Sequence, residues 1–74
     1  MTLQQILDRE RKCRCEGGEF GIKACKEQIK WELDYLETSL YKLLAEYVER
    51  SNTDLFFNRA MVLACWELIN EEEV

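Results

Sequence analysis

Apolar residues follow a helical period through the middle of the chain. They step by four, three, four, three and four residues, at Ile29, Leu33, Leu36, Leu40, Leu43 and Tyr47. This heptad seam is typical of a coiled coil, and the same spacing also occurs in ordinary bundle helices. The pattern therefore predicts one long helix over residues 20–50, with a bundle core favoured over a dimeric coiled coil.

A shorter helix is predicted before the long one. Thr2 and Gln5 have the spacing of a capping box, in which each side chain bonds the other residue's backbone N–H. The helix is expected to cover residues 2–15, because Gly17-Gly18 follows and glycine readily adopts the left-handed conformation of a helix C-terminus.

A third helix is predicted over residues 53–71, after a polar run at residues 51–54. Residues 55–69 are apolar on almost every helical face, so this helix must be surrounded by other elements. Leu63 within it and Leu40 in the seam are expected to be core residues.

These elements predict an all-α fold in one domain spanning residues 1–74, in which two shorter antiparallel helices lie along a long central helix. At 1.5 Å per residue the helices span roughly 21, 45 and 28 Å, so one chain would be about two helices thick. We expect a homodimer, or a higher oligomer, to complete the bundle. The alternatives are a compact monomer, in which the long helix bends near Gly21 or shortens, and a chain that needs a different partner to become fully ordered.

The composition limits where the protein is expected in the cell and which reactions it could catalyse. The sequence has no proline and no histidine, four cysteines, and neither a signal-peptide pattern nor an apolar run long enough for a membrane span, which predicts a cytoplasmic protein without a membrane partner. Without histidine there is no Ser-His or Cys-His pair, and no glycine-rich phosphate loop is present. We therefore expect neither an enzyme nor a bound cofactor.

The cysteines are the sharpest local feature. Cys13 and Cys15 precede the glycine pair and Cys25 follows it, whereas Cys65 is expected level with Thr38, too far from Cys25 to share a four-cysteine metal site. Burial as small apolar side chains is the commonest fate of free cysteines. A metal held by Cys13, Cys15 and Cys25, or a disulfide between Cys13 and Cys25, remains an alternative.

Charge is divided unevenly along the chain. The net charge is -5, with seven basic and five acidic residues in 1–30 and three basic and ten acidic residues in 31–74. The candidate basic contact patch comprises Arg9, Arg11, Lys12, Arg14, Lys23 and Lys26. Its cations could contact nucleic acid, complement a helix dipole or lower the pKa of Cys13 and Cys15, but the acidic remainder disfavours nucleic acid as the main partner.

Four residues are candidates for partner binding. Trp31 and Tyr35 are four residues apart on the side of the predicted long helix away from the seam, and paired surface aromatics are common at interfaces. Tyr41 and Val48 widen the apolar stripe beyond the seam. The sequence thus predicts a small acidic helical module that binds another protein, such as an adaptor, assembly subunit or inhibitor. A nucleic-acid-associated regulator using Arg9–Lys30 and a cysteine-based redox or metal sensor are the alternative functions.

Overall fold

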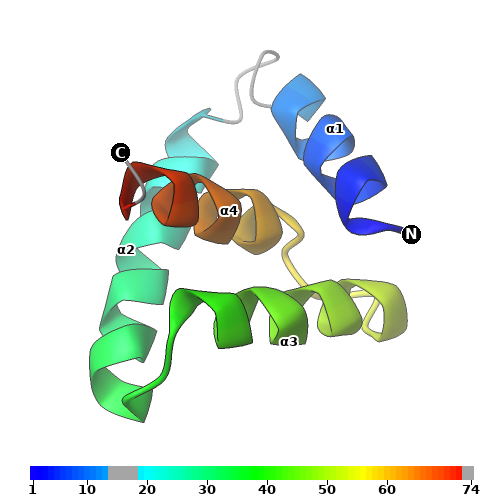
Figure 1. Ribbon diagram of the computed structural model, residues 1–74. Helices are drawn as coiled ribbons and strands as arrows, with labels where there is room; N and C mark the ends of the chain where they lie inside the picture. The colour runs from blue at the N-terminus through cyan, green and yellow to red at the C-terminus, as the bar shows by residue number, and fades with distance from the viewer. Residues whose placement is uncertain (14–18, 73–74) are drawn as a thin grey trace.

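The computed structural model describes residues 1–13 and 19–72, and within these ranges the chain is helical with no strand. Figure 1 shows the helices, which are α1 (Leu3–Cys13), α2 (Glu19–Leu36), α3 (Leu40–Thr53) and α4 (Ala60–Glu72). The predicted all-α class is therefore confirmed, but the predicted set of three helices is wrong.

α1 begins at the predicted capping box. The Thr2 amide donates to Oε1 of Gln5 at 2.8 Å, and the Gln5 amide donates to Oγ1 of Thr2 at 3.2 Å. These two bonds satisfy backbone N–H groups that have no partner inside the helix. The predicted end of the helix at residue 15 and the Gly17-Gly18 stop lie outside the described residues.

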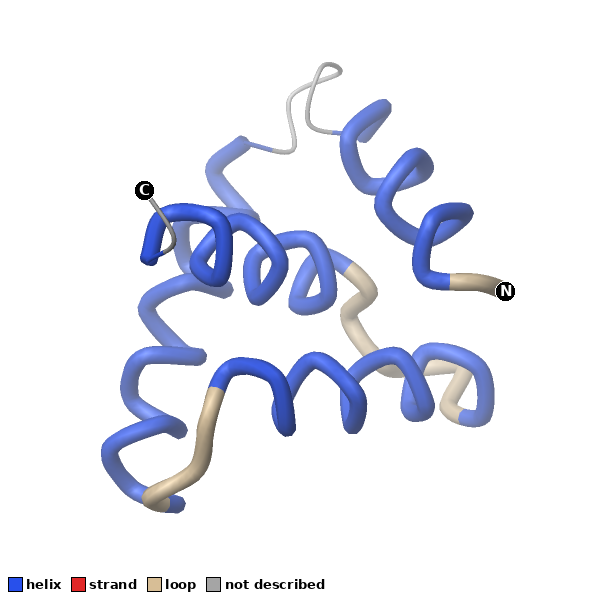
Figure 2. Tube along the Cα trace, viewed as in Figure 1, coloured by secondary structure: helices blue, strands red, loops and turns tan. Residues whose placement is uncertain are grey.

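The predicted single helix over residues 20–50 is wrong, because the chain turns between α2 and α3 (Figure 2). Glu37 adopts a left-handed backbone with φ of 50°, which an α-helix does not accommodate. The Ser39 side chain then accepts a bond from the Lys42 amide at 3.3 Å and caps α3. A dimeric coiled coil along residues 20–50 is therefore excluded, since its helix is interrupted.

α4 also differs from its prediction. Residues 54–59 form a loop, and the helix begins at Ala60 instead of near residue 53. The Asp54 amide donates to the Arg50 carbonyl at 2.7 Å and closes α3, while Oδ1 of Asn58 accepts from the Ala60 amide at 3.1 Å and starts α4. The Asn58 side chain thus bonds a backbone N–H that a continuous helix would use.

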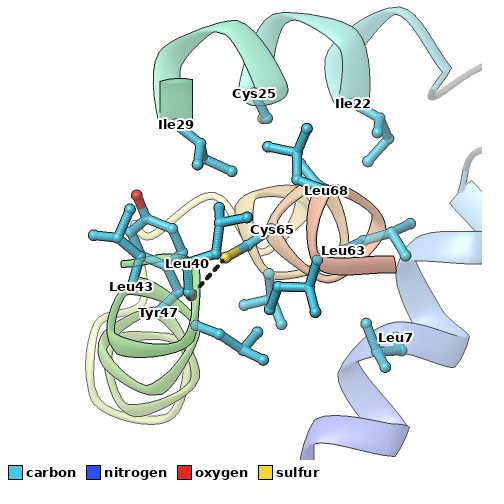
Figure 3. Close-up of a cluster of buried hydrophobic side chains, with 14 of the residues drawn as sticks. Leu7, Ile22, Cys25, Ile29, Leu40, Leu43, Tyr47, Leu63, Cys65 and Leu68 are labelled. Atoms are coloured by element: carbon cyan, nitrogen blue, oxygen red, sulfur yellow. Dashed lines mark hydrogen bonds between the residues drawn. The ribbon is translucent and has the colours of Figure 1, made fainter. Parts of the chain in front are cut away.

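α4 is the centre of the fold, because α1, α2 and α3 all pack against it (Figure 1). Its side chains Val62, Ala64 and Cys65 are fully buried, and Figure 3 shows Ile29 from α2 and Leu43 from α3 converging on this helix. The core comprises Ile6, Leu7, Ile22, Cys25, Ile29, Leu40, Leu43, Leu44, Tyr47, Val62, Leu63, Ala64, Cys65, Leu68 and Ile69.

One chain is thus enough to surround the most apolar helix. The predicted two-helix-thick chain, with two short helices lying along one long helix, is wrong, and so is the inference that a second copy must cover α4. The folded chain measures 32 × 27 × 21 Å along its principal axes. Among the described residues, no helix combines the length and the apolar character that crossing a membrane requires.

We expect Leu63→Ala to lower the free energy of unfolding by about 2–5 kcal/mol, because Leu63 is fully enclosed and its removal leaves a cavity beside α4. Leu55→Ala removes the same atoms from an exposed loop and should cost less than about 0.5 kcal/mol. Urea denaturation of the two variants measures both values. Equal losses for the two variants would contradict the burial of Leu63 in the core.

We expect Glu37→Gly to stabilise the protein by about 1 kcal/mol, because glycine adopts the left-handed conformation without the steric cost that a side chain bears. Glu37→Ala keeps the Cβ and should bring no such gain. Thermal unfolding of both variants at one protein concentration provides the comparison. A glycine variant less stable than the alanine variant would contradict the backbone conformation at this turn.

Candidate interaction surfaces

The first exposed apolar surface is the outer face of α2. Trp31 and Tyr35 are 58% and 71% exposed, and their rings stack with centroids 5.0 Å apart and planes 8° apart. Residues four apart lie one turn from each other on a helix, which allows this stacking. The two rings face away from the buried side chain of Ile29, as the sequence predicts.

Two further exposed apolar side chains lie on either side of the turn between α2 and α3. Tyr41, in the first turn of α3, is exposed, and Leu36 is 53% exposed at the end of α2. The sequence pattern places Leu36 in the seam, but α2 ends at this residue and its side chain is exposed instead of buried in the core. Val48, by contrast, is half-buried and packs against the core cluster, so it adds little to the exposed apolar surface.

The second exposed apolar surface is the loop between α3 and α4. Leu55 and Phe56 are 89% and 95% exposed, more than any other large apolar side chains among the described residues. The Phe56 amide donates to Oδ1 of Asp54 at 2.9 Å, which forms a local turn of the kind aspartate stabilises. The sequence prediction missed both side chains because it placed them inside a buried helix.

The neighbouring residue Phe57 anchors this loop. Its ring lies 5.7 Å from the ring of Tyr47, centroid to centroid, and the Arg50 guanidinium lies 4.7 Å from its centroid in a cation–π contact. Nε and Nη2 of Arg59 both donate to the Ser51 carbonyl at 3.4 Å. These contacts hold the loop on the C-terminal side of Leu55 and Phe56, and the Asp54 turn lies on the N-terminal side.

Tyr47 also connects two helices. Its buried hydroxyl on α3 donates to Oε2 of Glu32 on α2. Burial, followed by the hydrogen bond and negative charge of Glu32, raises the pKa of Tyr47 well above its ordinary value. The phenol therefore remains a neutral donor and helps to hold the angle between α2 and α3.

The candidate basic patch is spread over α1 and α2, and α4 supplies acidic partners. Lys26 binds Glu71 at 2.9 Å and Glu67 at 3.5 Å, so its charge is directed toward α4. Arg11 pairs with Asp8 at 3.7 Å within α1. The exposed residues Arg9, Lys12 and Lys23 complete the described part of the patch, and Arg14 lies outside the described residues.

The cysteines lie in different environments. Cys13 is exposed, whereas Cys25 and Cys65 are buried; all three are free thiols, so the structure does not contain the disulfide between Cys13 and Cys25 that the sequence left as an alternative. Cys65 donates to the Leu40 carbonyl at 3.3 Å, close to the level expected from the sequence (Figure 3).

Cys25 accepts from Nδ2 of Asn58 at 3.6 Å, a contact that joins α2 to the loop before α4. Burial raises the pKa of Cys25, with a further contribution from the charge of Glu10, and burial raises the pKa of Cys65 to about 12. The described residues contain no group of three cysteine or carboxylate side chains close enough to hold a metal, and Cys15 lies outside them.

Comparisons with protein-family models, with curated proteins and with solved structures gave no match to this chain. The candidate surfaces are therefore supported by the exposure and the contacts of their side chains.

The ion pair between Lys26 and Glu71 should make the packing of α2 on α4 depend on pH. The hydrogen bond from Lys26 lowers the pKa of Glu71 below its ordinary value of 4.5, so the pair stabilises the fold above that value and loses this effect as the pH falls through the lower pKa. The bond to Glu71 raises the pKa of Lys26 above 10.5, so the effect persists up to that pH and is lost above the raised pKa.

A double-mutant cycle of Lys26→Met and Glu71→Gln, measured by thermal unfolding, should therefore show coupling at pH 7 that is weaker at pH 3. Coupling of the same size at both pH values would mean that the two side chains interact by packing instead of by charge.

Thiol alkylation should distinguish the cysteines. In the folded protein at pH 8, iodoacetamide should modify Cys13 much faster than Cys25 or Cys65, because the thiolate is the reactive form and both buried thiols have raised pKa values. Mass spectrometry of the labelled peptides over time measures the three rates, and labelling in urea provides the control. Rapid modification of Cys65 in the native protein would show that α4 is less enclosed than described.

Proposed function

We propose that this protein is a small helical interaction module that acts by binding another protein, with Leu55 and Phe56 inserted into an apolar pocket of that partner. The observation that carries the proposal is the exposure of these two side chains, 89% and 95%, on a domain whose core is already complete. The core does not account for them, since α4 is covered by α1, α2 and α3.

The structure of the loop supports this role. Aromatic side chains buried near the centre of an interface supply much of the binding energy, and affinity is higher when the loop that bears them is already ordered. The Asp54 turn and the packing of Phe57 hold the backbone on both sides of Phe56. Little conformational entropy would therefore be lost from the loop on binding.

Charge favours a basic partner. The net charge is -5, and acidic proteins are steered toward basic surfaces of larger proteins. Nucleic acid is less favoured as the partner, because the net negative charge repels phosphates and Lys26 of the basic patch is already paired with Glu71. An adaptor, an assembly subunit or an inhibitor would each use the surface in this way.

The proposal is tested with the double variant Leu55→Ser/Phe56→Ser. A matched control, Tyr35→Ser/Leu36→Ser, removes two exposed apolar side chains from the other surface. Tagged copies of the wild type and both variants are crosslinked in the cells that naturally make the protein, and the captured proteins are quantified by mass spectrometry.

We expect at least one protein to be captured by the wild type and the control but lost with the loop variant. With that protein purified, the loop variant should bind at least about tenfold more weakly, while its unfolding free energy stays within about 0.5 kcal/mol of the wild type. Identical capture and affinity for the wild type and the loop variant would refute the proposal.

A further inference from the structure

The outer face of α2 has a second property besides its aromatic pair: the side chains on its first half are small and those on its second half are large. Gly21 and Ala24, near the start of the helix, are exposed and small, and a Cβ placed on Gly21 would meet nothing within 4 Å. Trp31 and Tyr35, near the end, are large. This face would therefore fit a helix with the same surface running in the opposite direction, with large residues over small ones.

A stripe of charged residues follows one edge of this face. Lys23, Glu27, Lys30 and Asp34 are all exposed and are spaced by four, three and four residues, which places them along one side of the helix. The spacing reads the same in both directions, but the order of charges inverts. If the stripes of two such helices face each other and the helices run antiparallel, each charged residue therefore lies opposite a residue of the other charge.

We propose that α2 pairs with α2 of a second copy of this chain, antiparallel and about a two-fold axis that passes between Gln28 and Ile29. In this arrangement Lys23 lies level with Asp34 of the second copy, and Glu27 lies level with Lys30 of the second copy. The symmetry repeats both pairs, so the edge contains four opposite-charge contacts. Tyr35 then lies over the small residues Gly21 and Ala24 of the other copy.

The rest of the fold leaves this face available. α4 packs on one side of α2, and in Figure 1 α2 lies at the border of the molecule with its other side uncovered. Leu55 and Phe56 follow the C-terminal end of α3, opposite the end that is joined to α2 (Figure 1), and their loop contacts α2 at Cys25, which is buried and lies off the outer face. A dimer through α2 would therefore leave that loop exposed, and the pairing does not depend on the binding of a foreign protein.

The contact is limited to one pair of helices. With 18 residues, α2 is about 27 Å long, so the dimer should exchange with monomer in the micromolar range instead of being permanent. This dimer differs from the one expected from the sequence, since it covers the outer face of α2 and contributes nothing to burying α4.

The test uses charge reversal. In Lys23→Glu the new carboxylate faces Asp34 of the other copy, and in Asp34→Lys the new cation faces Lys23 of the other copy. We expect each variant to raise the dimer dissociation constant at least about tenfold. An equimolar mixture should form the mixed dimer, because both contacts are then between opposite charges. The double variant Lys23→Glu/Asp34→Lys should likewise restore the homodimer.

Sedimentation equilibrium from micromolar to millimolar concentration measures all these states, and circular dichroism confirms that each variant is folded. Arg9→Glu, which makes the same change in net charge at an exposed position of α1, is the matched control and should dimerise like the wild type. Three results would each overturn the proposal: a wild type that is monomeric at every concentration, a mixture no more dimeric than its components, and a control weakened as much as Lys23→Glu.

Discussion

The fold depends on one constraint: α4 is apolar on almost every face of its first ten residues, and most of those side chains must be buried by other elements. Val62, Ala64 and Cys65 are fully buried on this helix, and the three other helices supply the enclosing side chains. A chain of 74 residues has little core to spare, so the placement of α1, α2 and α3 is set by what each can cover. Those helices make few contacts with one another, which leaves α4 as their common support.

Because the other helices of the same chain bury α4, the apolar side chains that remain exposed do not contribute to the core of the monomer. Most of them lie in two regions on different kinds of element: the helical face of α2 with its stacked rings, and the loop that exposes Leu55 and Phe56. The first suits a second helix, and the second suits a pocket. A protein with both could hold two partners at once, each through a different kind of contact.

The sequence predicted the helical class, the capping box at Thr2, and the burial of Leu63 and Cys65, because these follow from short-range chemistry and from apolar density. It did not predict the turn after Leu36, since the seam spacing continues across it and Ser39 is only one of many polar residues. It likewise missed the exposure of Phe56, which depends on side-chain bonds from Asp54 and Asn58 that an apolar pattern does not reveal.

The position of α4 in the chain has a consequence for biosynthesis. The helix on which the others pack is the last of the four to be made, so α1, α2 and α3 have no shared core to join while the ribosome is still producing residues 60–72. Short helices without tertiary support are marginal in water. We therefore expect the nascent chain to stay open until α4 emerges and then to fold as one unit, which leaves its early segments accessible to chaperones throughout translation.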